Sequence, residues 1–323
     1  MNKTLFLCLI VSFLLGSCSF KKDKFPEDSA AAINTIAVII DDQLWNGEVG
    51  DSIRNKFASP VLGLPQEEPL FTINQYPVKL FEGFSTDTRN IIIIKKSNEN
   101  KFKIKENEFS SPQNAFYIYG KTAFEILETL EKNTQIIIQK MRATEIAQNQ
   151  EIFKDSILDT QKIQKKFSID LVIPSKYEYI IRRRNFIWLK SEITSGNNSL
   201  LIYQIPYKSI HENNAVSDIL RTRDSIGKLY IHGSDRGTKM VTEEAYSPYF
   251  LKTTLAGRKT YETRGTWQMK NDFMSGPFIN YAIFDKENKR IVVLEGFCYA
   301  PSKEKRDLMF ELESIIKSIQ FKK

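Results

Sequence analysis

The chain has 323 residues, of which 41% are hydrophobic, 12% aromatic and 26% charged, with a formal net charge of +7. This composition is ordinary for a globular protein and excludes disordered and collagen-like chains and proteins that cross a membrane many times. Only two histidines and three cysteines occur, which excludes a His-rich metal site and a disulfide framework. The sequence therefore predicts no metal site and no cofactor, and it assigns no catalytic residue.

The N-terminus has the features of a secretory signal that ends at a lipid-modified cysteine. Residues 1–17 contain an apolar run, Leu5 to Leu15, that is too short to span a bilayer. The run ends in Leu-Leu-Gly-Ser-Cys18, which matches the bacterial lipobox, whose cysteine receives diacylglycerol and, in the mature protein, further fatty acyl chains. We therefore expect a lipid anchor at Cys18 and a flexible tether over residues 18–33.

Export changes the class of partner that the net positive charge predicts. In a cytoplasmic protein this excess would favour nucleic acid as a partner, but an exported lipoprotein meets anionic lipids and acidic polymers of the envelope. Lys21 and Lys22 follow the lipobox, where many surface-exposed lipoproteins of Bacteroidota have acidic residues. We expect a periplasm-facing protein that is held in the inner or outer membrane by its lipid, with no nucleic-acid partner. Its expected partner is an envelope protein or an anionic envelope polymer.

The first half of the mature chain alternates buried strands with helices. A strand is predicted at Thr35 to Ile40, and a helix follows whose apolar face carries residues 45, 49, 53 and 57 and which Pro60 ends. Further strands are predicted over residues 70–73, 91–94 and 115–119. No glycine or proline occurs from Lys121 to Ile173, which indicates one or two long helices. We expect an N-terminal α+β domain over residues 34–160, with a mixed sheet and a long helix.

The second half, residues 167–323, has the pattern of an antiparallel sheet with a terminal helix. Strands are predicted over 168–173, 177–192, 200–205, within 239–269, and over 278–284 and 290–299. A helix is predicted over residues 214–229, and the last helix is expected to follow Ser302 as its N-cap. The predicted fold class is α+β, with two α/β layers: the N-terminal mixed sheet with its long helix and this C-terminal antiparallel sheet with a terminal helix.

Several short motifs resemble one known family. Asp41 to Asp51, Gly63 to Phe71 and Arg89-Asn90-Ile91 resemble Bacteroidota lipoproteins grouped as domain of unknown function 4837. The C-terminal motifs resemble the same family and extend the likeness over nearly the whole mature chain: Gly276-Pro277-Phe278, Glu295-Gly296-Phe297 and Ala300-Pro301-Ser302. The resemblance implies export and lipidation but no activity. The second half also resembles the sheet-and-helix layer of PsbP and Mog1-like proteins, which serve mainly as binding modules.

The first predicted helix carries the sharpest candidate site, an acidic and aromatic cluster of Asp41, Asp42, Trp45, Asn46, Glu48 and Asp51. Two carboxylates about 5 Å or about 6.5–9.5 Å apart can share acid and base roles in glycan hydrolysis, and a neighbouring tryptophan can stack on a sugar ring. The simpler interpretation makes Glu48 and Asp51 a solvated helix face and Trp45 a core anchor.

Two further groups are candidate binding residues. Glu67 and Glu68 lie in a loop fixed by prolines, which presents their carboxylates to a partner or a cation unless the loop is simply solvated. Arg182 and Arg184 are expected on one face of a strand, where a pair of guanidinium groups could bind phosphate or carboxylate. The alternative is a solvated sheet face.

The start of the last helix is unusually basic. Lys303, Lys305 and Arg306 lie in its predicted first turn, where the helix dipole disfavours cations. This placement suggests an external anionic partner. Together the observations predict a lipid-anchored envelope protein with a binding or structural role; the alternative is a carboxylate-dependent hydrolase of envelope glycans that uses Glu48 and Asp51.

Overall fold

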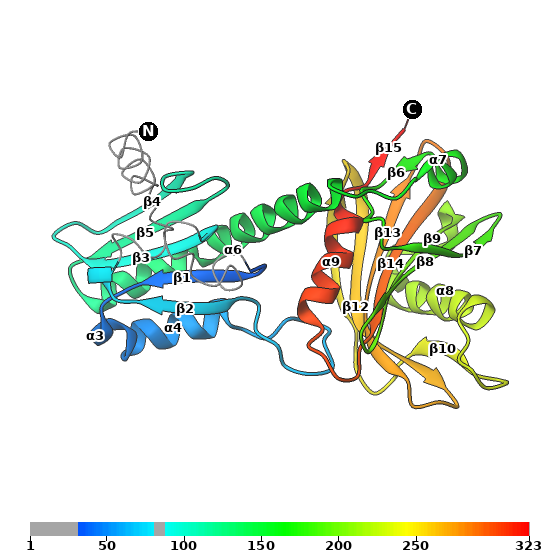
Figure 1. Ribbon diagram of the computed structural model, residues 1–323, viewed down its shortest axis with the longest axis horizontal. Helices are drawn as coiled ribbons and strands as arrows, with labels where there is room; N and C mark the ends of the chain where they lie inside the picture. Colours follow the sequence, from blue (N-terminus) through cyan, green and yellow to red (C-terminus); the bar gives the residue numbers. More distant parts are fainter. Residues whose placement is uncertain (1–31, 81–87, 323) are drawn as a thin grey trace, which may run out of the picture.

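The computed structural model describes residues 32–80 and 88–322. Figure 1 shows two sheet regions joined by the long helix α6 (Ala123–Lys154). We call residues 32–154 the N-terminal region and residues 155–322 the C-terminal region. The expected signal, Cys18 and most of the expected tether lie outside the described residues. Within the described ranges, no helix combines the length and the apolarity that crossing a membrane requires.

The N-terminal region contains a five-stranded mixed sheet in the order β2-β1-β3-β5-β4. Its strands are β1 (Thr35–Ile39), β2 (Thr72–Tyr76), β3 (Asn90–Lys96), β4 (Lys101–Glu106) and β5 (Asn114–Gly120). Only β4 runs antiparallel to its neighbour. The sequence did not predict β4, because its Lys-Phe-Lys-Ile-Lys-Glu sequence belongs to a mostly exposed edge strand in which charges outnumber apolar residues.

One face of this sheet packs against helices α4 (Glu48–Phe57) and α6, with the short α3 (Asp42–Trp45) at its edge. The prediction of one continuous helix through Trp45 to Phe57 was wrong at Asn46-Gly47, where the chain turns between α3 and α4. The turn is tight, since a Cβ added at Gly50 would meet the Trp45 carbonyl oxygen at 1.8 Å. A short 3-10 helix, η1 (Val78–Leu80), follows β2.

The C-terminal region contains an antiparallel sheet of eight strands in the order β10-β12-β13-β14-β9-β8-β7, with β11 also paired to β12. The strands are β7 (Glu178–Arg183), β8 (Phe186–Ile193), β9 (Gly196–Pro206), β10 (Lys239–Thr242), β11 (Tyr249–Leu255), β12 (Arg258–Lys270), β13 (Ser275–Asp285) and β14 (Arg290–Tyr299). The run predicted as one strand over residues 177–192 is therefore a hairpin. The short strands β6 (Ile169–Asp170) and β15 (Gln320–Phe321) pair with each other.

Helices cover both faces of this sheet. The face that carries Val292 and Leu294 packs against α9 (Arg306–Lys317), and the face that carries Ile291 and Val293 packs against α8 (Ala215–Tyr230). The remaining helices are α7 (Gln161–Phe167), η2 (Tyr207–Ser209) and η3 (Glu212–Asn214). This arrangement confirms the predicted fold class, with a mixed sheet and long helix followed by an antiparallel sheet and terminal helix.

Candidate functional site

A carboxylate from the N-terminal region caps helix α9. Both oxygens of Glu68 accept hydrogen bonds from the backbone N–H of Lys305, at 2.8 and 2.9 Å, and one oxygen also accepts from the N–H of Arg306 at 2.6 Å. Arg306 donates back to the carbonyl oxygen of Pro69 and to the Thr72 hydroxyl. The helix begins at Arg306 with no side-chain cap of its own, so the prediction of Ser302 as N-cap was wrong. Glu68 places a negative charge inside the molecule at the basic turn that suggested an external partner.

A second buried carboxylate, Glu145 of α6, joins three elements. Arg89 donates to it from Nε at 3.1 Å and from Nη2 at 2.9 Å, and Asn90 donates from Nδ2 at 2.8 Å. The backbone N–H of Asn34 donates to the same carboxylate at 3.2 Å. Because Glu145 is fully buried, these partners offset the cost of removing its charge from water.

A third buried carboxylate, Glu313 of α9, lies between the two regions. It forms ion pairs with Arg142 of α6 at 2.7 Å, Arg264 of β12 at 3.0 Å and Lys317 at 2.7 Å. Burial alone would raise the pKa of Glu313, but the three cations hold it well below its ordinary value. Glu68 and Glu313 connect the two regions directly, whereas Glu145 binds residues of the N-terminal region, one of which, Asn34, donates from its side chain to Asp307 of α9 at 2.9 Å. We call the contacts of these three carboxylates, with the hydrogen bond from Asn34 to Asp307, the interregion junction. The carboxylates of the junction are all paired with donors of the protein itself, so their role is to stabilise the fold.

The predicted site on the first helix lies mostly at the exposed surface. Arg54 lies over the Trp45 ring at 4.5 Å from its centroid and pairs with Asp51 at 2.7 Å. One face of the tryptophan ring is therefore occupied by a guanidinium group. Glu48, Asp51 and Asn46 are exposed, which matches the solvated helix face that was the simpler interpretation. The hydrolase hypothesis stays a prediction.

The other candidate residues are separated as well. Arg182 lies in β7 near the Tyr179 ring, whereas Arg184 lies in the turn between β7 and β8. The expected pair of guanidinium groups on one strand face was wrong, because the hairpin turn begins at residue 184. Of the two loop carboxylates, Glu68 is buried in the junction and Glu67 is exposed.

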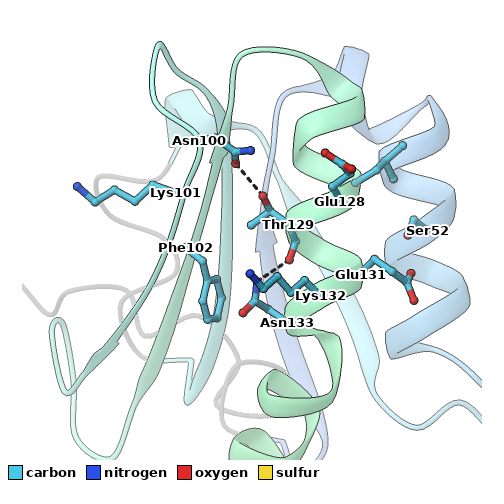
Figure 2. A pocket seen from close by; sticks show the side chains of 10 residues that line it. Ser52, Asn100, Lys101, Phe102, Glu128, Thr129, Glu131, Lys132 and Asn133 are labelled. Atoms are coloured by element: carbon cyan, nitrogen blue, oxygen red, sulfur yellow. Dashed lines mark hydrogen bonds between the residues drawn. The ribbon is translucent and has the colours of Figure 1, made fainter.

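A hollow of about 860 Å³ lies between edge strand β4 and helix α6. Figure 2 shows it from close by. Its walls are residues of α4, of the β3–β4 turn, of β4 and of α6: Ser52, Asn100, Lys101, Phe102, Leu127, Glu128, Thr129, Glu131, Lys132 and Asn133. We call it the β4–α6 cleft. Because β4 was not predicted, no sequence pattern indicated that Phe102 would face a helix here.

The cleft combines one aromatic ring with amides and opposite charges. The Phe102 ring points toward α6 (Figure 2), and Thr129 donates to the side-chain oxygen of Asn100 at 2.8 Å. Lys132, Glu128 and Glu131 of α6 add charges of both signs to the lining, whereas the Lys101 side chain points away from α6 (Figure 2) and pairs with Glu99 at 3.4 Å. Glu131 pairs with Lys56 of α4.

In contrast to the junction, the cleft has unused polar groups. Among the described residues, the side chains of Glu128 and Lys132 have no ion-pair or hydrogen-bond partner. The Asn100 amide nitrogen likewise makes no hydrogen bond to the described part of the chain, while its oxygen is held by Thr129. These groups can therefore bind a ligand without first breaking contacts within the protein.

The structure offers little for metal or thiol chemistry. Within residues 32–80 and 88–322, no group of three or more His, Cys, Asp or Glu side chains is arranged to hold a metal ion. Cys298 is buried, as predicted, and burial raises the pKa of its thiol to about 12. The thiol therefore stays protonated at neutral pH.

Two family models match the chain, and their matches meet at the end of α6. The model described as "Domain of unknown function (DUF4837)" matches residues 156–318, and "Domain of unknown function (DUF8532)" matches residues 29–154. The resemblance to domain of unknown function 4837 is thus confirmed over the C-terminal region. The motifs at Asp41 to Asp51 and Gly63 to Phe71 lie within the second match.

Comparisons with individual proteins are more distant. No curated protein matches the chain significantly. A crystal structure from Bacteroides thetaiotaomicron is 9% identical with a TM-score of 0.28, and the match covers 48% of this chain and 46% of that one. The Ran-binding protein Mog1p of Saccharomyces cerevisiae is 9% identical with a TM-score of 0.32, over 48% of this chain and 90% of that one. The chain thus spans less than half of the Bacteroides protein, and both TM-scores are too low to support a shared function.

Proposed function

The chain belongs to the family of domain of unknown function DUF4837, and from that premise we propose that it is a lipid-anchored binding module of the bacterial cell envelope. Its ligand occupies the β4–α6 cleft and is rich in hydroxyl and amide groups, as an envelope glycan is. The observation that carries the proposal is the unused polar lining of this cleft beside a single aromatic ring. Shallow polar sites with one apolar wall suit ligands that are themselves amphipathic.

The charges in the cleft favour a glycan over a strongly anionic polymer. Lys101 pairs with Glu99 and Glu131 pairs with Lys56, and the cleft also contains one further lysine, Lys132, and one further carboxylate, Glu128. The cleft therefore has no excess of positive charge to attract phosphate or carboxylate groups. The Phe102 ring can cover the apolar C–H face of a pyranose. The Asn100 amide and the Glu128 carboxylate can then donate to and accept from its hydroxyl groups.

The lipid anchor is supported by the lipobox that ends at Cys18. The first described residues are fixed beside the junction, because Arg89 donates to the Ala32 carbonyl oxygen at 2.9 Å. The fourteen residue steps from Cys18 to Ala32 (32 − 18) can span at most about 50 Å when fully extended. An anchor at Cys18 would therefore hold the cleft within reach of the envelope layers next to the membrane.

Calorimetric titration with a soluble disaccharide muropeptide tests the ligand. We expect binding that Phe102→Ala weakens at least tenfold. The control is Phe124→Ala, because Phe124 is 67% exposed on α6 but does not line the cleft. No heat of binding at millimolar muropeptide, or an equal loss in both variants, would overturn the proposed site.

Membrane fractionation tests the anchor separately. We expect the wild-type protein in the membrane fraction and Cys18→Ala in the soluble fraction of the envelope or retained as an unprocessed precursor. Mass spectrometry of the wild-type N-terminus should find an acylated Cys18. An unmodified N-terminus on soluble wild-type protein would refute the anchor but leave the muropeptide result standing.

A further inference from the structure

Strand β11 has one edge without a partner. It pairs with β12 from Tyr249↔Arg264 to Leu255↔Arg258, and β12 is its only partner in the described sheets. Within the described residues, no backbone hydrogen bond from residues 249–255 reaches any other element. Tyr249 is 50% and Leu251 58% exposed. A seven-residue strand with an open, partly apolar edge is a docking surface for another extended chain unless something blocks it.

Hollows lie at both ends of this edge. At the Tyr249 end, a hollow of about 390 Å³ is lined by Tyr246, Tyr249 and the proline-fixed loop around Leu62. Leu62 and Tyr246 are 55% and 64% exposed, so this hollow offers exposed apolar side chains to a partner. At the Leu255 end, a hollow of about 510 Å³ lies between Leu255 and an apolar strip of α6: Ala143, Ile146 and Ala147.

Both hollows are continuous with the interregion junction. The loop that lines the first is fixed by the Glu68 cap and crosses closely over β12, since a Cβ added at Gly63 would meet the Arg264 Cβ at 2.8 Å. The α6 face that lines the second is fixed by the ion pair from Arg142 to Glu313. The N-terminal region therefore supplies a rigid wall at each end of β11.

We propose that the β11 edge binds an extended segment of another protein as an added strand, at a site independent of the β4–α6 cleft. The unpaired N–H and C=O groups of a strand edge are complementary to one kind of partner, a second extended backbone. At about 3.3 Å per residue the seven residues of β11 span about 20 Å. A segment of similar length therefore reaches from one hollow to the other and places an alternate side chain in each.

The positive charge of Lys252 indicates which kind of segment binds the β11 edge. Lys252 lies at the centre of β11 and makes an exposed ion pair with Glu212 at 3.0 Å, which is a weak contact. A second copy of this chain paired about the centre of the strand would bring two Lys252 side chains opposite each other, which is unfavourable. A foreign segment with a carboxylate at its centre and apolar residues toward its ends complements both the lysine and the hollows.

Hydrogen exchange with a synthetic peptide tests the proposal. The probe is the capped heptapeptide Val-Thr-Thr-Glu-Thr-Thr-Val, added to the full mature protein; with its glutamate opposite Lys252, its end valines lie opposite Tyr249 and Leu255, which line the two hollows. We expect it to slow the exchange of amides within residues 249–255 at least tenfold. The same peptide with alternate amides N-methylated cannot complete the ladder and should give no protection.

A charge swap identifies the contact. Lys252→Glu should weaken binding of the glutamate peptide at least tenfold, and a peptide with lysine at its centre should restore it. Phe102→Ala, which changes only the cleft, should leave peptide binding unchanged. Protection of the edge without peptide that rises with protein concentration would show that a second copy covers it. That result, equal protection by the N-methylated peptide, or no protection by any peptide at millimolar concentration would overturn the proposal.

Discussion

The interregion junction and the β4–α6 cleft use similar side chains in opposite ways. In the junction, Glu68, Glu145 and Glu313 are buried and each has several donors. In the cleft, Glu128 and Lys132 are exposed and have no partner among the described residues. Because a buried charge is stable only when paired, the junction charges stabilise the arrangement of the two regions. The cleft charges contribute little to stability and are free to bind.

Removing the charge of Glu313 should have the largest effect on stability, and it tests whether the junction carboxylates hold the two regions together. Glu313→Gln leaves the partly buried Arg142 without its carboxylate, while Arg264 keeps only its ion pair with Glu262 at 2.6 Å. We expect the substitution to lower the free energy of unfolding by about 3–5 kcal/mol. Denaturant unfolding measures the loss. The matched control is Glu304→Gln, whose residue is exposed near the start of α9 and which should change stability by less than about 0.5 kcal/mol. Equal effects would contradict a structural role for the junction.

The same carboxylate predicts a pH dependence. Since the pKa of Glu313 is lower in the folded than in the unfolded protein, its contribution is fully present above its unfolded pKa, about 4.3. The contribution is lost as pH falls from there through the folded pKa. Stability measured from pH 7 down to pH 3 should therefore fall less steeply in Glu313→Gln than in the wild type. Parallel profiles would contradict this assignment.

The Glu68 cap should have the next largest effect. Glu68→Ala leaves the first N–H groups of α9 without their acceptor, and we expect a loss of about 1–3 kcal/mol. Glu67→Ala changes the exposed neighbouring carboxylate and should be nearly neutral. Denaturant unfolding of the two variants compares them, and a loss that is the same in both would show that α9 does not depend on this cap.

Two glycines with the same backbone conformation test whether the proline-fixed loop packs closely on β12. Gly63 and Gly237 both have φ of +84°, but an added Cβ meets Arg264 only at Gly63 and has open space at Gly237. Both alanine variants should lose stability because alanine disfavours the left-handed backbone conformation. Gly63→Ala should lose about 1 kcal/mol more than Gly237→Ala in thermal unfolding, because the loop must also move off β12. No difference would argue against close packing of this loop.

Cleft substitutions should have the smallest effect on stability. Phe102 is only partly buried, so Phe102→Ala should cost about 1 kcal/mol or less. A thermal unfolding curve close to that of the wild type, together with weakened ligand binding, would separate the cleft from the junction. A large loss of stability would instead make Phe102 a core residue.

Local patterns predicted much of the fold because each element's own residues determine it. Buried runs such as Ile91 to Ile94 and the helix that follows Lys121 were predicted because their apolar spacing is local. Strand β4 was not, because the packing of Phe102 against α6 depends on tertiary contacts. The same applies to the candidate site: Glu68 was singled out as a rigidly presented carboxylate, but its acceptor role depends on Lys305, far away in sequence.

The most direct test of the account is a titration of the isotope-labelled protein with soluble muropeptide, followed by backbone amide NMR. We predict shifts concentrated in residues 100–102 and 127–133, with residues 68, 145 and 313 and their partners unchanged. Shifts centred on the junction, or no shifts at millimolar muropeptide, would contradict the account.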